Sequence, residues 1–574
     1  MLNALLIRQY GSAAGSGRRG FFRAAPARAS KLNHLMPIIE SRVDPNSETF
    51  CANRGQMLAR IGDFRALEQK VRDFSNAKRD RFRARGQLLP RERVALLIDP
   101  GAPWLELSTL AGFRMHDDDG AEGIQGGGGI SGIGYVSGIR CIVSANDSGI
   151  KGGTSTPMGV KKHLRIQQIA LENKLPFVRL VESGGANLLY QAEMFVEGGR
   201  GFANQARMSA AGIPQVTVVH GSSTAGGAYL PGLSDYVILV RGRAKVFLAG
   251  PPLLRAATGE IATDEELGGA EMHATVSGLG EYLAEDDADG IRIAREVMVK
   301  LPWNEQLPLR QQKSFKEPRY PVEELAGVVP SDYRKPYDVR EVIARIVDDS
   351  DYLDFKALYG PHTVCGHAEI EGHAVGLIGN NGPIDADGAA KAAQFIQLCC
   401  QANMPIVYLQ NTTGYMVGRD AERAGIIKHG SKMIQAVANA TVPQLTIHVG
   451  ASFGAGNYGM CGRAYDPRFI FAWPSNRIAV MGGEQAAKVM AIVTEEKLKR
   501  EGKPIDKARI EGMEKAIVTR MEGESTALYA TARLWDDGLI DPRDTRKVLG
   551  FCLSICREAD IRPLKPNTFG VARM

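Results

Sequence analysis

The chain has 574 residues, of which 44% are hydrophobic and 23% are charged, and its formal net charge is +6. This globular composition excludes fibrous and wholly disordered proteins, and the length suits two to four domains. No run approaches the roughly 18 apolar residues of a membrane span, so we expect no membrane partner. Residues 1–35 hold six basic residues and no acidic ones, and without them the net charge is zero. Since a nucleic-acid-binding protein carries its positive charge in the folded part, we expect no nucleic-acid partner.

Residues 1–35 are also rich in Ala, Gly and Ser, a composition typical of organellar transit peptides. We interpret this segment as a transit peptide, as a disordered extension, or as the result of an upstream start codon, with Met36 opening the protein. Either way, we exclude it from the fold.

The predicted elements follow in chain order. Charged residues and helix formers over 50–98 predict helices that lead into the core, and β-branched apolar runs over 130–146 predict two strands. Helices are expected over 161–173 and 200–211. Buried strands precede and follow the second of these helices, so the alternation predicts an α/β fold.

A segment rich in proline and charge, residues 303–337, predicts a linker. A second α/β region follows it. We therefore expect one domain over 36–310 and another over 311–574.

The two halves repeat each other at one constant offset. Pro176 opens PFVRLVESGGA and Pro405 opens PIVYLQNTTGY, while Pro214 opens PQVTVVHGSSTAGGAY and Pro443 opens PQLTIHVGASFGAGNY. The same offset relates two further pairs, Gly221 with Gly450 and Tyr229 with Tyr458. We interpret the halves as two copies of one domain, called the first copy and the second copy below, with a site expected at the seam between copies.

Each copy has two strands that end in turns of small residues. The turns comprise Ser183–Ala186 and Thr224–Gly227 in the first copy, and Thr413–Gly414 and Gly454–Gly456 in the second. Successive free N–H groups in such turns can hold a developing oxyanion. The alternative is tight backbone packing at strand ends, which four matched turns make the weaker interpretation.

Other candidate groups are few. Glu182 and Asp235 lie near strand ends, where solvation or turn capping is favoured over a general base, and His220 is interpreted as a packing residue without a partner. The eight cysteines form no CxxC pair, and although Cys552 and Cys556 share the spacing of a helical face, no further ligands accompany them. We expect buried structural thiols, a reducing compartment and no metal.

Several catalytic motifs are absent from the sequence. It contains no GxSxG elbow and no GxxxxGK[ST] phosphate loop, and the glycine run at 126–134 does not follow a strand as a dinucleotide motif would. The residues therefore suggest oxyanion holes without a nucleophile or base. Such a site fits chemistry that stabilises an enolate while the substrates transfer their own proton.

The motifs resemble one family closely. NDSGIKGGT, ESGGA, STAGGAY, QNTTGYMVG, SFGAGNYGMCGRAYDPRF and AVMGGEQAA are similar to segments of the carboxyltransferase (β) subunits of biotin-dependent acyl-CoA carboxylases, in the methylcrotonyl-CoA and geranyl-CoA branch. The resemblance spans nearly all of 36–574. It implies two tandem crotonase-like (ClpP/crotonase) carboxyltransferase domains, in agreement with the repeat.

The resemblance also implies roles for residues in the turns. The amides of Gly184 and Gly185 would hold the thioester oxygen of an acyl-CoA, and those of Ala455 and Gly456 would hold the biotin oxygen. We expect further substrate-binding positions at Ser183, Ala186, Gly226 and Gly227.

The cofactors and partners follow from the same resemblance. Coenzyme A would carry the acyl group. Biotin would arrive on a separate α subunit, because this chain has no AMKM biotinylation motif and no ATP-grasp region. The family pattern is a β6 core in an α6β6 assembly, with each site between the first domain of one subunit and the second domain of another. The bacterial cytoplasm is implied, or the mitochondrial matrix if residues 1–35 are a transit peptide.

The segment after ESGGA bears on the acyl group. Methylcrotonyl-CoA enzymes of the family place Phe, Ile and Tyr where this chain has Gly198, Gly201 and Ala203. The smaller residues would leave room for a C10 isoprenoid, so geranyl-CoA is favoured over 3-methylcrotonyl-CoA and over another acyl-CoA. Neutral loop variation is the alternative. Lys151, Lys161 and Lys162 could meet the CoA phosphates, or could equally be solvated surface residues.

Two other functions stay open. A biotin-dependent decarboxylase would use the same half-reaction in reverse, with a membrane subunit as its partner. An inactive scaffold subunit is disfavoured, because ESGGA and FGAGNYG are intact.

Overall fold

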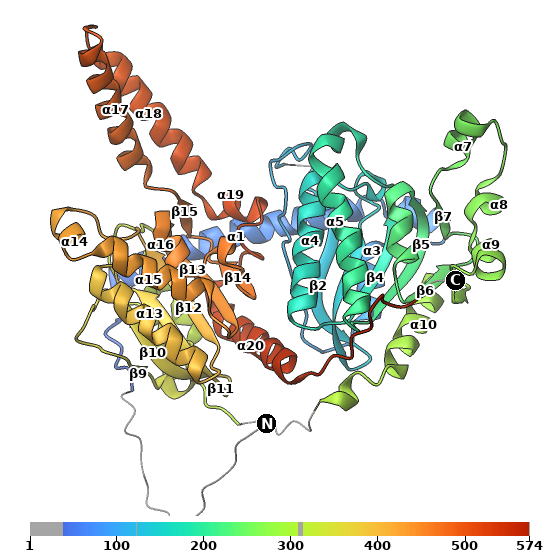
Figure 1. The fold of residues 1–574 in the computed structure, drawn as a ribbon, viewed down its shortest axis with the longest axis horizontal. Coiled ribbons are helices and arrows are strands. Elements are labelled where there is room, and N and C mark those ends of the chain that lie inside the picture. The colour runs from blue at the N-terminus through green and yellow to red at the C-terminus, as the bar shows by residue number, and fades with distance from the viewer. Residues whose placement is uncertain (1–37, 122, 308–313, 573–574) are drawn as a thin grey trace, which may run out of the picture. The chain divides into compact units, whose positions relative to one another are not determined.

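Two β-sheets, one in each copy, organise the structure (Figure 1). The computed structural model describes residues 38–121, 123–307 and 314–572. The order in the first sheet is β1 (Leu105–Glu106), β2 (Gly129–Val136), β3 (Ile139–Asn146), β4 (Phe177–Ser183), β5 (Gln215–Thr224), β6 (Tyr236–Val240) and β8 (Tyr282–Ala284), with β7 (Lys245–Phe247) beside β5.

The second sheet repeats this plan. Its order is β14 (Phe469–Ala472), β13 (Gln444–Phe453), β12 (Ile406–Thr412), β11 (His373–Asn380), β10 (Thr363–Ile370) and β9 (Leu353–Asp354), with β15 (Arg477–Ala479) beside β13. In both sheets the central strands are parallel and an antiparallel hairpin, β2–β3 or β10–β11, lies to one side. The predicted α/β fold is confirmed.

The helices of the first copy precede and connect its strands. They are α1 (Glu48–Asn76), α2 (Arg79–Ala84), α3 (Pro90–Leu97), α4 (Pro157–Glu172), α5 (Gln191–Ala210), α6 (Tyr229–Gly232), α7 (Pro251–Thr258), α8 (Asp264–Gly268), α9 (Ala270–Met272) and α10 (Asp287–Lys300). The helices predicted over 50–98 and 161–173 are confirmed.

One helix is longer than predicted. The sequence predicts it over 200–211, whereas α5 begins at Gln191, so Gly198 and Gly201 lie on a helix and not in a variable loop. Glycine lowers helix propensity by about 1 kcal/mol per residue, which hides the helix from a propensity reading. Burial of Met194 and Met208 fixes the apolar face of α5 against the core.

The second copy and the chain end supply the remaining helices. These are α11 (Leu325–Val328), α12 (Arg340–Ile343), α13 (Ala386–Gln401), α14 (Arg419–Arg423), α15 (Ile426–Ala438), α16 (Gly454–Gly459), α17 (Gly483–Arg500), α18 (Lys507–Glu524), α19 (Ala527–Ala532) and α20 (Thr545–Ile561). Among the described residues, no helix is both long and apolar enough to cross a membrane.

The predicted repeat is present in the backbone. The offset between Pro176 and Pro405 also relates the bounds of β4 to those of β12, and the bounds of β5 to those of β13. The β4–β5 register shifts between residues 181 and 183, and the β12–β13 register shifts between 410 and 412. Ala225 and Gly454, which occupy matching positions, have φ values of 52° and 54°. The two copies therefore share the geometry of their turns.

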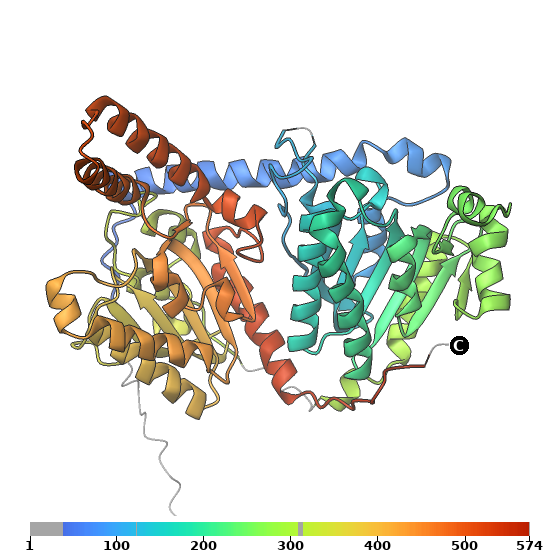
Figure 2. The same ribbon diagram turned by 45° about the horizontal axis from the view of Figure 1, so that its top comes forward.

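One hydrophobic core cluster reaches from Phe64 and Phe177 in the first copy to Trp473 in the second. A polar joint accompanies it, because Nε of Arg165 in α4 lies 2.9 Å from Oδ1 of Asp537. The helix α1 passes both sheets in Figure 2, and Asn53 in it donates to the carbonyl oxygen of Gly327 at 3.3 Å.

Part of the predicted linker belongs to this core. Leu325 and Ala326 in α11 are fully buried. The predicted boundary between 310 and 311 lies outside the described residues, as does the segment 1–35, so both stay predictions.

Six cysteines are buried, as predicted, but Cys400 is half-buried and Cys51 is exposed. Cys552 and Cys556, the pair interpreted as structural thiols and not as metal ligands, are both among the buried six. The described part of the chain contains no cluster of three His, Cys, Asp or Glu side chains that could hold a metal ion.

Candidate active site

A cavity of about 690 Å³ opens at the carboxyl ends of β3, β4 and β5. Parallel strands bring their following turns to one sheet edge, which is where ligands bind in such sheets. All residues that line the cavity lie between 127 and 230. They include five of the predicted substrate and oxyanion positions, namely Ser183, Gly185, Ala186, Gly226 and Gly227.

The turns can form only because their residues are small. A Cβ on Gly227 would lie 2.8 Å from Oγ of Ser183, and a Cβ on Gly184 would lie 2.8 Å from Cγ2 of Thr154. Gly185 has a φ of 78°, a conformation that favours glycine. Tight packing and ligand access therefore coexist, since the turns are crowded on the protein side and open to the cavity.

The amides of these turns differ in their engagement. The N–H of Gly185 donates to Oγ of Ser183 at 3.2 Å. Gly226 and Gly227 lie in the first turn of a short helix, Ala225–Ala228, where N–H groups lack intrahelical acceptors. Gly184 is exposed but does not line the cavity. The structure thus adds Gly226 and Gly227 to the candidate amide donors.

The second copy repeats the arrangement. The N–H of Gly414 donates to Oγ1 of Thr412 at 3.2 Å, as Gly185 does to Ser183. A Cβ on Gly456 would lie 2.9 Å from Cα of Gly414. Ala455 is exposed, like its counterpart Gly226. Gly456 is buried, like its counterpart Gly227. Neither Ala455 nor Gly456 lines the cavity of the first copy.

Much of the cavity lining is apolar. Two of the three predicted acyl-pocket residues, Gly198 and Gly201, lie in its wall. A Cβ on Gly198 would have no described atom within 4 Å, so a larger side chain there would project into open space. The apolar lining includes Leu188, Met194, Phe195, Val196, Phe202 and Leu230.

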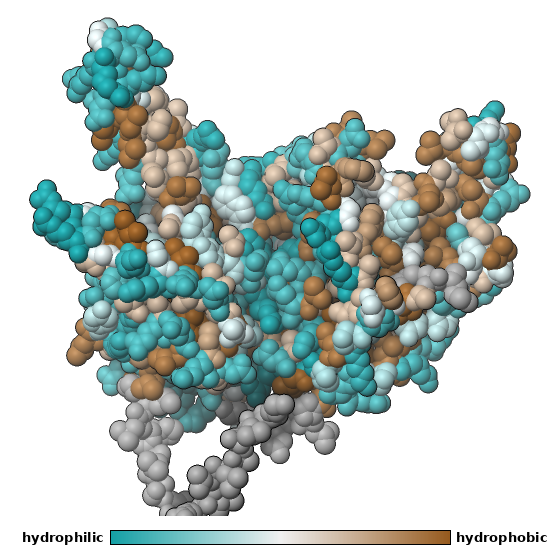
Figure 3. Space-filling model, in the orientation of Figure 1, coloured by the Kyte–Doolittle hydropathy of each residue, from teal (hydrophilic) through white to brown (hydrophobic). Residues whose placement is uncertain are grey.

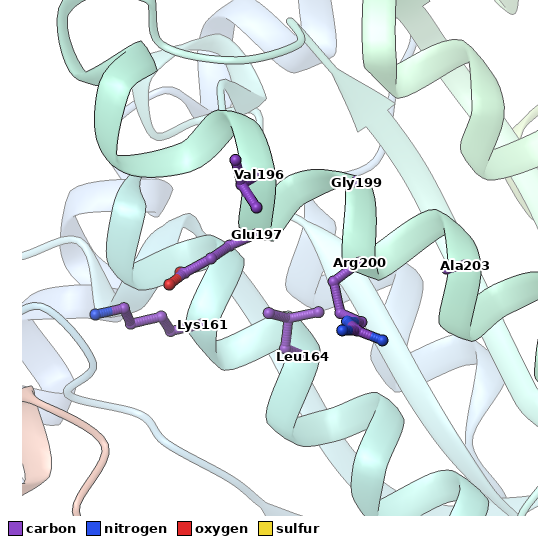
Figure 4. Close-up of a pocket in the computed structure, with 7 residues that line it drawn as sticks. All are labelled: Lys161, Leu164, Val196, Glu197, Gly199, Arg200 and Ala203. Carbon is purple, nitrogen blue, oxygen red and sulfur yellow. The ribbon is translucent and has the colours of Figure 1, made fainter.

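Ala203 lies elsewhere. It lines a neighbouring, more open pocket of about 670 Å³ between α4 and α5, with Lys161 and Arg200 (Figure 4). The role of Ala203 in the acyl pocket stays a prediction, because the two pockets adjoin and share Leu164, Val196 and Gly199 in their linings. Residues on a helix share a face at intervals of three or four, so position 203 is rotated away from 198.

The three candidate lysines have different surroundings. Lys162 is buried in the cavity wall, where its ammonium donates to the carbonyl oxygens of Gly126 at 3.0 Å and Gly129 at 2.7 Å. The alternative of a solvated surface lysine is wrong for Lys162, because its side chain is buried and supports the glycine-rich loop. Burial lowers the pKa of Lys162 to about 8. Lys151 pairs with Asp117, and Lys161 is exposed.

The remaining polar candidates have structural partners. Asp235 accepts hydrogen bonds from the hydroxyl of Ser209 at 2.5 Å and the N–H of Gln215 at 2.9 Å, which confirms turn capping. Glu182 is buried in an ion pair with Arg93, not solvated. His220 was predicted to lack a partner, but its Nδ1 lies 2.8 Å from Oδ1 of Asp287. The long sequence separation of His220 and Asp287 hid that pair from sequence reasoning.

His163 was not predicted. Its ring lines the cavity, and its Cδ2 would lie 3.5 Å from a Cβ on Gly201. Burial, with the nearby charge of Arg179, lowers the pKa of His163 to about 3, so the ring is neutral near pH 7. A neutral ring suits the wall of an apolar pocket.

Known proteins match over almost the whole chain. The carboxyl transferase domain model covers residues 81–568. The probable biotin-dependent acyl-coenzyme A carboxylase beta2 subunit of Mycobacterium tuberculosis is 49% identical, over 94% of this chain and 100% of its own. The probable mitochondrial methylcrotonoyl-CoA carboxylase beta chain of Drosophila melanogaster is 48% identical, and the match covers 94% of this chain and 95% of that protein.

A solved structure agrees with these relatives. The β subunit of geranyl-CoA carboxylase from P. aeruginosa superimposes with a TM-score of 0.88 at 64% identity, and the match covers 94% of this chain and 100% of that one. The two sheets are thus those of two tandem crotonase-like domains, and carboxyltransferase is the activity that these matches share. The chain belongs to the carboxyl transferase family, among the β subunits of biotin-dependent acyl-CoA carboxylases.

Proposed function

We propose that this chain catalyses transfer of CO₂ from carboxybiotin to the γ-carbon of geranyl-CoA, and that the proton lost from the γ-carbon passes to the biotin from which CO₂ has left. The observation that carries the choice of substrate is the open space beside Gly198 in an apolar cavity wall. A C10 acyl chain has more apolar surface to bury than a C5 chain, and each additional buried CH₂ favours binding by about 0.8 kcal/mol. The similar P. aeruginosa protein, a geranyl-CoA carboxylase β subunit, supports the same substrate. 3-Methylcrotonyl-CoA is the alternative, supported by the names of other relatives.

The turns have separate roles in this proposal. Amides of Gly184 and Gly185 hold the thioester oxygen and so stabilise the enolate. Gly226 and Gly227 offer further candidate amides beside them, and Ser183 and Ala186 shape the surrounding site. The N–H of Gly185 already donates to the hydroxyl of Ser183. When substrate binds, this N–H either donates to both the hydroxyl and the thioester oxygen or leaves the hydroxyl for the thioester oxygen. Ala455 and Gly456 offer the matching amides to the urea oxygen of biotin. Carboxybiotin supplies the CO₂ when the carrier domain is bound.

We further propose that the chain works with a biotin-carrying α subunit and forms a β6 core within an α6β6 assembly. Exposed apolar side chains support association, because such patches mark interfaces. They gather over the α7–α9 region and over the hairpin of α17 and α18 (Figure 3), and include Leu253, Ile261, Val276, Val489, Ile492 and Val493. Light scattering of the purified chain tests the β6 core, and a monomer would contradict it.

The compartment depends on the first residues. We propose the bacterial cytoplasm, with the mitochondrial matrix as the alternative if residues 1–35 are a transit peptide. Relatives include both mycobacterial proteins and mitochondrial ones. N-terminal sequencing of the mature protein from its source distinguishes the two, because a transit peptide is removed.

A coupled assay tests the substrate. The chain is co-expressed with its α subunit and supplied with ATP, bicarbonate and either geranyl-CoA or 3-methylcrotonyl-CoA. We expect kcat/KM to favour geranyl-CoA at least tenfold, since a C5 chain leaves the apolar wall unfilled. Gly198→Phe should lower kcat/KM for geranyl-CoA about tenfold or more and change that for the C5 substrate less than threefold.

Ala203→Phe is the matched control, because it adds the same side chain to the same helix in the other pocket. It should change neither value more than threefold. A preference of the wild type for 3-methylcrotonyl-CoA would overturn the choice of substrate and leave carboxyl transfer intact.

A further inference from the structure

A buried ion-pair network lies directly behind the turn that follows β4. Glu182, the penultimate residue of β4, is 7% exposed, and its Oε2 lies 2.8 Å from Nη1 of Arg93 in α3. Nε of Arg93 lies 3.1 Å from Oδ2 of Asp287, which begins α10. Oδ1 of Asp287 in turn contacts the ring of His220 in β5. Four elements are therefore tied together where β4 leaves the sheet.

Glu182 occupies the irregular point of the sheet. The β4–β5 register shifts between residues 181 and 183, so Glu182 faces a bulge of β5 around Gly221. A Cβ on Gly221 would lie 2.8 Å from Cδ of Glu182, so the carboxylate stem fills the space above this glycine. Arg93 fixes the far end of the same side chain. The position of Ser183 and of the turn beyond it follows from this anchor.

The second copy closes the same bulge with different chemistry. Asn411 takes the place of Glu182 there, and its Oδ1 accepts a hydrogen bond from the N–H of Ala451 at 3.0 Å. A Cβ on Gly450 would lie 2.3 Å from that oxygen. Both copies thus use this position to hold the bulge, although the first copy needs a buried arginine to do so.

The network contains more positively charged than negatively charged side chains. Arg93 contacts both carboxylates, while Nη1 of Arg85 lies 3.9 Å from Glu182 and Nη1 of Arg243 lies 3.9 Å from Asp287. Three guanidinium groups therefore face two carboxylates. Burial alone would raise the pKa of Asp287. Hydrogen bonding to His220 and the charge of Arg93 nevertheless hold this pKa at about 2, so the carboxylate stays ionised.

We propose that Glu182 is a positioning residue for carboxyl transfer, which, held by Arg93, places the Ser183–Gly184–Gly185 turn. The inference rests on the proposed role of that turn in holding the thioester oxygen. Glu182 acts through the backbone and contacts no reacting atom in this arrangement. Displacement of oxyanion donors by about 1 Å can lower a rate about 100-fold, so a modest shift of the turn is measurable.

The variant Glu182→Gln tests this role, because it keeps the shape of the side chain and removes the charge that holds Arg93. We expect kcat to fall tenfold or more while KM for the acyl-CoA stays within twofold, since the lost placement matters in the transition state. The holoenzyme is assayed with geranyl-CoA and with 3-methylcrotonyl-CoA. Whichever substrate the wild type prefers serves for the comparison, so a wrong choice of substrate is recognised separately from a wrong role for Glu182.

Glu558→Gln is the matched control. Glu558 lies in α20 and is 6% exposed. Its carboxylate pairs with the guanidinium groups of Arg562 at 2.8 Å and Arg140 at 3.2 Å. It should lower Tm as Glu182→Gln does and leave kcat within twofold. If Glu182→Gln does not fold, Glu182→Asn, which imitates the second copy, carries the same expectations. An unchanged or higher kcat, a loss confined to KM, or an equal loss in Glu558→Gln would overturn the proposal.

Discussion

The turns after β4 and β12 share one backbone plan but are supported differently. Glu182 reaches a buried arginine, whereas Asn411 bonds directly to the backbone of β13. Strand bounds and register shifts coincide between the copies, and the side chains behind them do not. The two copies have therefore kept the same backbone geometry at their turns, while the side chains that support the turns differ. Variants in and between the two copies test how far that equivalence extends.

The largest expected effect concerns the joint between the copies. Asp537→Ala removes the partner of Arg165 and Arg463, whose charges hold the pKa of Asp537 well below its usual range against the effect of burial. Breaking a buried pair costs about 3–5 kcal/mol, so the urea midpoint should fall clearly. Glu484→Ala, which breaks an exposed pair with Arg334, should cost about 1 kcal/mol or less. Similar midpoints for the two variants would show that the copies are stable without this joint.

The next effect separates the matched glycines of the turns. Gly456→Ala places a Cβ 2.9 Å from the backbone Cα of Gly414, whereas Gly227→Ala meets the side chain of Ser183. The hydroxyl of Ser183 can rotate away from the added Cβ, whereas the backbone of the Gly414 turn cannot. We expect kcat to fall about 100-fold in Gly456→Ala and about tenfold in Gly227→Ala. Equal losses would mean that the two turns are supported with the same rigidity.

A smaller effect distinguishes buried aspartates by pH. Burial raises the pKa of Asp536 to about 7, whereas the pKa of Asp287 is held at about 2. The folded protein binds the Asp536 proton more tightly than the unfolded chain, whose carboxyl titrates near about 4. The stability from Asp536 is therefore full below about pH 4 and lost as pH rises to about 7.

Melting curves between pH 5 and 8 test this difference. Relative to wild type, Asp536→Asn should gain Tm as pH rises, because it removes a buried charge. The contribution of Asp287 is present above about pH 4 and is lost only as pH falls toward 2, so Asp287→Asn should lose a constant amount of Tm over this range. A constant difference for Asp536→Asn would contradict the expectation.

The smallest effect concerns the matched tyrosines Tyr229 and Tyr458, which are 46% and 45% exposed. Removing either hydroxyl should change stability by no more than about 0.5 kcal/mol. Activity of Tyr229→Phe and Tyr458→Phe should stay within twofold of wild type. A large loss in only one variant would reveal a role that the repeat does not share.

The local sequence pattern was enough to predict the positions of the strands and of the small-residue turns that follow them. The constant offset between the halves located β12 and β13 from β4 and β5, and the small residues marked the turns that line the cavity. Contacts distant in sequence were not predictable, because Arg93 and Asp287 carry no local mark of their pairing with Glu182 and His220. Lys162 looked like a surface lysine until folding placed the carbonyls of the glycine loop around its ammonium.

The ends of the chain also bear on how it is made. The N–H of Asn567 donates to the carbonyl oxygen of Ala210 at 2.8 Å, and the N–H of Val571 donates to Oγ of Ser209 at 3.1 Å. Near the other end, the hydroxyl of Ser41 bonds to Glu341 at 2.5 Å. During synthesis the first copy therefore emerges from the ribosome long before residues 567–571, which cover part of its surface. Ser41 likewise has to be synthesised long before Glu341, its hydrogen-bond partner in the second copy. Although domains usually fold as they emerge, this chain cannot complete the surface of its first copy until the second copy has been synthesised.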